Sequence, residues 1–215
     1  MSPENFQNTN IYDEPLAFPH PAPTTSHLSH PGATLSTTRL LAFCDGVFAI
    51  VITLLAFQFD VPKNIPPEKI ATQLPLELLK IVPSIGTYML SFILVGIFWI
   101  AHHNIFSYIR RIDRTFLWLN LSLLMGLAFL PFPTKLLGYY MISPHAVRMY
   151  CGTLFVTSMN FFLIWWYASG SHRLIDAHLA PDLIRWARQR ALAAPIVYAA
   201  AFAVTYRTVL GGLFL

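Results

Sequence analysis

Residues 81–101 read IVPSIGTYMLSFILVGIFWIA, and this uncharged stretch decides the fold. A helix needs about 20 predominantly apolar residues to cross the hydrocarbon core of a bilayer. Similar runs occupy residues 40–59, 115–132 and 149–168, and a shorter, alanine-rich run occupies residues 191–206. The runs are too long for barrel strands and lack strict alternation of apolar and polar residues. The sequence therefore predicts an all-α, polytopic transmembrane helix bundle with five spanning helices.

The overall composition leads to the same class of protein. Apolar residues make up 55% of the 215 residues and charged residues 11%, against about 25% charged in ordinary globular chains. A soluble fold of this size cannot hide so much apolar surface, which excludes a cytosolic enzyme, a disordered regulator and a nucleic-acid binder. The net charge of +4 results from a shortage of acids and fits loops at a membrane surface. Cys44 and Cys151 provide neither a disulfide framework nor a metal-ligand spacing.

Both ends of the chain lie outside the apolar runs. Residues 1–35 are rich in Pro, Ser, Thr, Asn and His and have no apolar period, which predicts a disordered N-terminal tail rather than a signal peptide. His20, His27 and His30 in this tail do not favour a metal site, and we expect no cofactor or metal. Residues 36–215 form the transmembrane domain, and after Arg207 only residues 208–215 remain, so we expect a short or truncated sixth helix.

Lysine and arginine in the connections predict the orientation in the membrane. The second and fourth connections carry Arg110, Arg111, Arg114, Arg173, Arg185, Arg188 and Arg190. The first and third carry Lys63, Lys69, Lys80, Lys135 and Arg148. The even connections are richer in arginine, which predicts that they and the N-terminus are cytoplasmic in a multi-pass protein of the cell membrane.

Several polar residues interrupt the apolar runs and are costly in a membrane, so they indicate a functional or buried polar site. Asp45 lies near the start of the first run and Arg39 lies six residues before it. Either Arg39 is an interfacial anchor and Asp45 caps a nearby group, or a buried network joins the first helix to another helix. His102 and His103 end the second run after Trp99. Either they form an interfacial polar cluster, or one of them hydrogen-bonds Asp45.

The first run also carries a helical stripe. Ile50, Thr53, Leu54 and Phe57 are spaced i, i+3, i+4 and i+7, which places them on one face of a helix. In any membrane helix such a face can contact lipid or a neighbouring helix. The sequence contains no HExxH, GxSxG, GxGxxG or Walker motif, so catalysis has no motif to support it and we expect no enzyme.

Three segments together resemble the transmembrane protein 175 family, which consists of potassium channels. Residues 39–45, RLLAFCD, resemble the family motif Arg-x-x-x-Phe-Ser-Asp that opens the first helix, and the resemblance extends over residues 38–206. Residues 99–103, WIAHH, and residues 130–134, LPFPT, are also similar to the family. Cys44 stands where the family has serine, Phe57 stands where it usually has an aliphatic residue, and the sixth helix of the family is shortened here.

The resemblance implies a potassium-selective channel in which four identical subunits surround one pore lined by the first helix. It implies that Ile50 forms an apolar constriction, that Thr53 adds a hydroxyl layer linked to selectivity, and that Leu54 and Phe57 form further apolar layers. A carbonyl-lined Thr-Val-Gly-Tyr-Gly filter is missing from the sequence. The residues expected to hold the pore helix in place are Arg39, Phe43, Asp45, His102 and His103. The expected partners are other copies of the chain, membrane lipids and potassium ions, with no nucleic acid.

Two other functions compete with a channel. A secondary transporter, or a non-conducting membrane protein, could be built on similar helices, although a transporter is expected to show internal repeats and broken helices, and we find no repeat. An integral-membrane enzyme would require His102, His103 and Asp45 to converge on one water-accessible pocket.

Overall fold

The computed structural model describes residues 36–63 and 65–213, with side chains described through residue 205. Its helices are α1 (Thr37–Ala56), α2 (Ile70–Tyr108), α3 (Arg114–Phe129), α4 (Pro131–Tyr139), α5 (Pro144–Ser169) and α6 (Pro181–Leu213), with short 3₁₀ turns η1 (Pro67–Lys69) and η2 (Gly170–His172). No strand occurs among these residues, which confirms the all-α class. The tail of residues 1–35, with His20, His27 and His30, lies outside the described residues.

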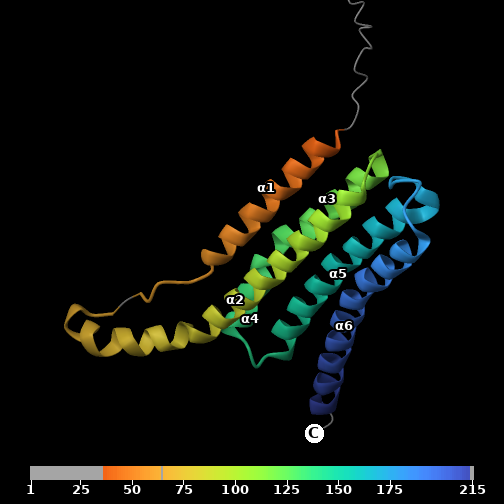
Figure 1. Ribbon diagram of the computed structural model, residues 1–215. Coiled ribbons are helices and arrows are strands. Elements are labelled where there is room, and N and C mark those ends of the chain that lie inside the picture. The colour runs from red at the N-terminus through yellow and green to blue at the C-terminus, as the bar shows by residue number, and fades with distance from the viewer. Residues whose placement is uncertain (1–35, 64, 214–215) are drawn as a thin grey trace, which may run out of the picture. The chain divides into compact units, whose positions relative to one another are not determined.

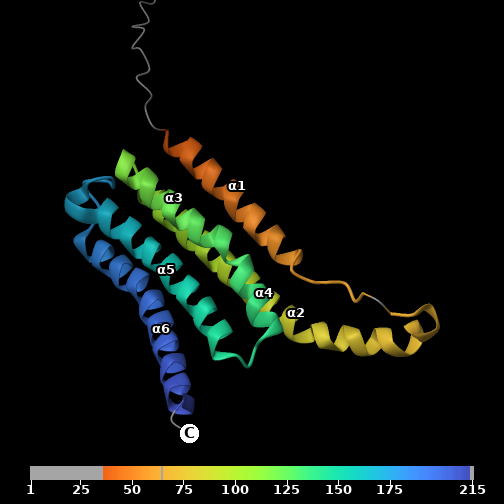
Figure 2. The same cartoon turned by 180° about the vertical axis from the view of Figure 1, so that it is seen from behind.

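The helices form a bundle in which α1 and α6 occupy opposite edges (Figure 1). α1 packs on α2 and α3, α3 packs on α5, and α5 packs along α6. The view from behind shows the same order across the bundle (Figure 2). The first turn of α1 is capped by Ser36, whose Oγ accepts a hydrogen bond from the backbone N–H of Arg39 at 3.4 Å.

α2 is longer than the second apolar run. It has 39 residues and begins eleven residues before Ile81, although its first part carries Glu77 and Lys80. The charged residues and prolines of this segment suggest a connection, but in the structure the segment is helical and continuous with the apolar run. This first part bends away from the rest of α2 in both views (Figures 1 and 2). Pro75 and Pro83 lie inside α2, and at each the missing N–H and the ring disrupt the hydrogen-bond ladder.

The third span is built from two helices, and the third connection is shorter than the sequence indicates. α3 ends at Phe129 and α4 starts at Pro131, whose missing N–H is tolerated at the first position of a helix. The assignment of Lys135 to a connection is wrong, because Lys135 lies within α4. The actual connection to α5 is residues 140–143.

α6 covers more than the fifth apolar run. It begins at Pro181, so Arg185, Arg188 and Arg190 lie in its first turns and not in a loop. At its other end it runs through Leu213, so the residues expected to start a sixth helix continue α6 as far as they are described. Residues 205–213 contain no proline, so no proline interrupts α6 in this segment.

Four stretches are long and apolar enough to cross a membrane: Thr37–Ala56, Pro67–Tyr108, Arg114–Tyr139 and Pro144–His172. They contain the first four apolar runs except residues 57–59, which confirms a polytopic membrane protein. The fifth run lies in α6, which does not meet the same criterion over its described residues.

α2 and α4 are joined by close packing and a buried hydroxyl cluster. A Cβ added to Gly138 would lie 2.9 Å from the Ser84 and Thr87 hydroxyl oxygens, so only glycine permits this approach. Further along, the Ser91 Oγ lies 2.8 Å from the Thr134 Oγ1 and 2.9 Å from the Tyr150 hydroxyl of α5. All three side chains are buried, and their mutual hydrogen bonds satisfy polar groups that would be costly to bury alone.

Candidate functional site

α1 has two different faces. Its buried face consists of Cys44, Phe48, Val51 and Leu55, each of which is at most 1% exposed. This helix packs on α2, α3 and α4. On the other side, the stripe of Ile50, Thr53, Leu54 and Phe57 is uncovered by its own chain; Ile50 is 58% exposed and Phe57 is 81% exposed. An apolar face that the subunit leaves open must contact lipid, a second copy or a pore.

Thr53 is the polar member of this stripe. Its Oγ1 donates a hydrogen bond to the backbone carbonyl of Ile50 at 2.8 Å, one turn earlier in the same helix. Because the hydroxyl proton is used within the helix, the lone pairs of Oγ1 remain as acceptors on the exposed side. An exposed acceptor of this kind is able to contribute an oxygen ligand to a cation.

Asp45 ties α1 to α2 through Trp99. The indole Nε1–H of Trp99 donates to the Asp45 Oδ1 at 2.9 Å. The hypothesis that a histidine hydrogen-bonds Asp45 is wrong, because within the described part of the chain Asp45 accepts its side-chain hydrogen bond from Trp99. His103 lies beside Trp99 with a ring separation of 5.9 Å, and His102 points to a different neighbour.

His102 joins α2 to α3 instead. It is 1% exposed, and its Nε2 lies 3.1 Å from the Asn120 Oδ1. The Asn120 Nδ2 donates to the carbonyl of Phe116 at 2.8 Å, so Oδ1 is the acceptor and the His102 Nε2 carries the proton. The imidazole also packs on Phe48 of α1, with ring centroids 5.5 Å apart. His102 is therefore one of the groups on which the buried face of α1 rests.

The remaining residues of the expected network do not enter it. Arg39 and His103 are exposed, and Phe43 is 56% exposed on the uncovered side of α1. Arg39 makes only its backbone contact with Ser36 among the described residues. The structure thus brings together Asp45 with α2 and His102 with α3, and it leaves Arg39, Phe43 and His103 at the surface of the single chain.

These positions also decide against a pocket that uses His102, His103 and Asp45 together. His102 is buried and bonded to Asn120, whereas Asp45 is bonded to Trp99. Throughout the described residues, no three His, Cys, Asp or Glu side chains lie close enough to hold a metal ion. The geometry that an enzyme would require is therefore not formed by these three side chains.

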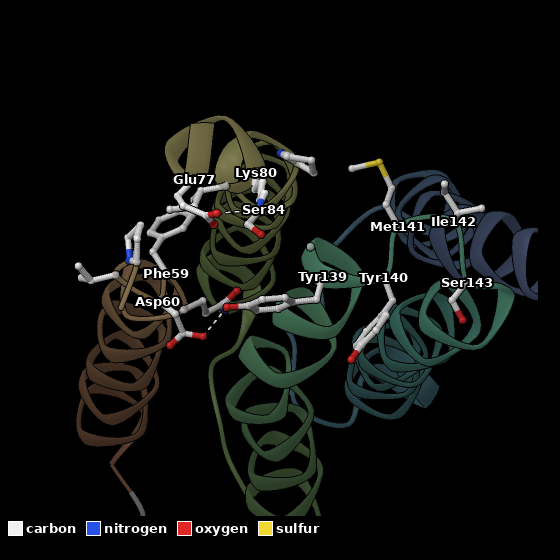
Figure 3. A pocket seen from close by; sticks show the side chains of 16 residues that line it. Phe59, Asp60, Glu77, Lys80, Ser84, Tyr139, Tyr140, Met141, Ile142 and Ser143 are labelled. Carbon is white, nitrogen blue, oxygen red and sulfur yellow. Dashed lines mark hydrogen bonds and ion pairs between the residues drawn. The ribbon is translucent and has the colours of Figure 1, made fainter. Parts of the chain in front are cut away.

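The other end of α1 is fixed by a second carboxylate. Asp60 follows the last turn, and its Oδ2 lies 3.0 Å from the Lys135 Nζ and accepts a short hydrogen bond from the Tyr139 hydroxyl. Asp60 and Tyr139 line a pocket of about 780 Å³, which Glu77 and Lys80 of α2 also line. Figure 3 shows Asp60 and Tyr139 joined across the space between α1 and α4. The hydrogen bond from Tyr139, followed by that from Lys135, lowers the pKa of Asp60 below its ordinary value.

Sequence reasoning missed Asn120, Ser91 and Tyr150 as partners. Asn120 had a usable signal, because it is an amide within an uncharged run and an unpaired amide is costly there. Ser91 and Tyr150 carry no such signal, since hydroxyl side chains occur throughout membrane helices and often bond to their own backbone.

Comparison with known proteins identifies related chains. Residues 39–131 match the model of a family described as the endosomal/lysosomal potassium channel TMEM175. A potassium channel of Streptomyces collinus is 36% identical over 156 residues, which are 71% of this chain and 74% of that one. A potassium channel of Chamaesiphon minutus is 36% identical over 180 residues, which are 80% of this chain and 86% of that one. The crystal structure of a lysosomal potassium-selective channel TMEM175 homolog from Chamaesiphon minutus is similar with a TM-score of 0.69 and 32% identity, covering 82% of this chain and 90% of that one.

Proposed function

This chain belongs to the TMEM175 family, and from that premise we propose that it is a potassium-selective channel in the cell membrane. In this proposal four identical subunits surround one axis, and α1 of each subunit lines the central pore. The two bacterial relatives that are about one-third identical over most of this chain are named potassium channels, which supports the choice of ion. The same comparison supports a channel over an enzyme.

The observation that carries the proposal is the uncovered face of α1. Ile50 and Leu54 are 58% and 45% exposed in the single chain, although the opposite face of the same helix is closed. An uncovered face on a helix at the edge of the bundle is free to meet the same face of other copies (Figure 1). A four-fold arrangement would turn one stripe per subunit into rings of four side chains.

In the proposed pore, Ile50 forms the constriction. An apolar ring offers a cation no coordination and tends to exclude water, so it is a barrier in itself. Conduction then requires the ring to widen and become hydrated. Leu54 and Phe57 would form further apolar layers toward the end of α1, where Phe57 is 81% exposed at the helix C-cap.

Thr53 supplies the oxygen ligands next to the constriction. Its hydroxyl proton is directed to the Ile50 carbonyl, so four copies would present four acceptor oxygens within one turn of the Ile50 ring. Potassium gives up its hydration water at a smaller cost than sodium. A narrow apolar ring followed by weak oxygen ligands would therefore favour potassium, without the carbonyl filter that this sequence lacks.

The distribution of arginine supports an orientation with the N-terminus in the cytoplasm. One end of the bundle holds five helix termini: the start of α1, the end of α2, the start of α3, the end of α5 and the start of α6 (Figure 1). Arginines at this end are Arg39, Arg110, Arg111, Arg114, Arg173, Arg185, Arg188 and Arg190. An excess of arginine marks the cytoplasmic side of a membrane protein. The end with Asp60 would then face outward.

The experiment that tests this function is ion flux in reconstituted vesicles. Purified protein is placed in vesicles with a potassium gradient, and potassium and sodium fluxes are measured with and without a second ion. We expect passive potassium flux that exceeds sodium flux and needs no coupled ion. Strict coupling to a second ion would identify a transporter, and flux equal to that of protein-free vesicles would contradict the proposal.

A further inference from the structure

A second cavity lies at the arginine-rich end, away from the uncovered face of α1. It has a volume of about 550 Å³ and is formed by α2, α5 and α6. Phe161 and Trp165 of α5 form its floor. Ile97 of α2 lines one wall and Ala194 of α6 lines the other. Most of the lining is apolar, so this cleft between membrane helices suits a hydrocarbon chain.

The two walls have different side chains. α6 contributes the small residues Ala187, Ala191 and Ala194, together with Trp186 and Arg190. From the level of Ala187 to that of Ala194 the cleft follows the helix for roughly 10 Å, at 1.5 Å per residue. The cleft is therefore an elongated slot along the helices, and α5 and α6 lie side by side beneath it in both views (Figures 1 and 2).

Hydrogen-bond donors without partners gather at the mouth of this slot. The Arg190 guanidinium stacks on the Trp186 ring at 4.8 Å and has no acidic partner within the described part of the chain. Asn104 and Tyr108, in the last turns of α2, line the same cleft. Their side-chain amide and hydroxyl also form no hydrogen bond to any described residue. One fixed positive charge and two neutral donors at the end of an apolar slot match a phosphate group that carries a hydrocarbon chain.

We propose that this cleft binds one acyl chain of an anionic phospholipid, with the headgroup phosphate held by Arg190, Asn104 and Tyr108. The lipid comes from the leaflet at the arginine-rich end. A zwitterionic lipid fits the apolar slot as well, but its ammonium group lies near Arg190 and weakens the contact. The cleft therefore selects by headgroup charge at its mouth and by shape along its walls.

The test uses the full chain in detergent and phospholipids with brominated acyl chains, which quench tryptophans that they touch. Trp165 and Trp186 line the cleft and report the bound chain. In the wild type we expect brominated phosphatidylglycerol to reach half-maximal quenching at a concentration about tenfold below that of brominated phosphatidylcholine. Arg190→Gln should abolish this preference. The matched control is Arg185→Gln, because Arg185 lies on the same helix but is bound to Asp182 at 2.5 Å.

A second pair of variants tests the slot itself. Ala191→Phe fills the cleft and should remove the part of the quenching that comes from Trp165 and Trp186, whereas Ala193→Phe, at an exposed position outside the cleft, should leave that part unchanged. Equal loss of preference in Arg190→Gln and Arg185→Gln would overturn the proposal in favour of general surface charge. Unchanged quenching of Trp165 and Trp186 in Ala191→Phe would also overturn it, and fewer subunits per particle in that variant would show that a second copy of the chain covers the cleft.

Discussion

Two carboxylates fix α1 to the rest of the chain, and they do so in opposite ways. Asp45 lies within the helix and accepts a hydrogen bond from the neutral indole of Trp99. Asp60 lies beyond the end of the helix and binds the cationic Lys135 and the Tyr139 hydroxyl in an open pocket. The two contacts therefore differ in the charge of the partner: Asp45 has a neutral donor, whereas Asp60 has a cationic partner, so salt and pH control the outer contact.

The largest effect is expected from removing the inner carboxylate. Asp45→Ala removes the acceptor of the Trp99 N–H, and loss of a hydrogen bond to a charged group costs on the order of 1–3 kcal/mol. We expect a lower unfolding temperature and loss of subunit assembly, measured by thermal unfolding and by particle mass in detergent. A variant that assembles normally but loses potassium selectivity would mean that Asp45 faces the pore.

A smaller effect is expected when the donor of the same contact is removed. Trp99→Phe keeps an aromatic ring but lacks the N–H, so it should lower the free energy of unfolding by about 1 kcal/mol. Trp118→Phe is the matched control, because Trp118 is 71% exposed and forms no hydrogen bond to any described residue. The double variant Asp45→Ala, Trp99→Phe should lose less free energy of unfolding than the sum of the losses in the two single variants. Full additivity would show that the two side chains do not interact.

These contacts also show what sequence reasoning could and could not provide. Asp45 and His102 stood out because ionisable groups are rare in apolar runs, and both turned out to hold helices together. Their partners could not be predicted, because pairing depends on how each helix is rotated. Trp99 and His102 leave α2 in directions about 60° apart, so a small difference in rotation decides which one reaches Asp45.

In the fold, too, some features could be predicted from the sequence and others could not. The apolar runs predicted the spans because bilayer thickness sets their length. The extension of α2 back to Ile70, the break before Pro131 and the early start of α6 at Pro181 were not predicted. Charged residues near a span occur in helices as readily as in loops, so composition does not fix the helix ends.

The smallest effect on stability is expected at the outer contact, and it should depend on pH. The folded-state pKa of Asp60 lies below its unfolded value of about 4. Its stabilising contribution is therefore present above that unfolded value and is lost as the pH falls through the folded-state pKa. We expect Asp60→Asn to lower the unfolding temperature at pH 7, by less than Asp45→Ala does, and to have a smaller effect as the pH falls below about 4.

Salt separates the two contacts in the same experiment. At 1 M salt the Debye length is about 3 Å, so the difference between wild type and Asp60→Asn should shrink. The difference between wild type and Asp45→Ala should persist, because the inner contact has a neutral donor. Equal sensitivity of both differences to salt would contradict the distinction between the two anchors.

The most direct test of the proposed function is potassium flux after a substitution at the proposed constriction. Ile50→Asn places a polar group on the uncovered face that the two anchors hold in position, and Ile196→Asn makes the same change at an equally exposed position, 59%, on α6. With equal amounts of protein in the vesicles, we predict that Ile50→Asn raises potassium flux and admits more sodium, because a hydrated ring no longer excludes water. Ile196→Asn should conduct like the wild type. Unchanged flux and selectivity in Ile50→Asn, or equal changes in both variants, would contradict a pore lined by this face of α1.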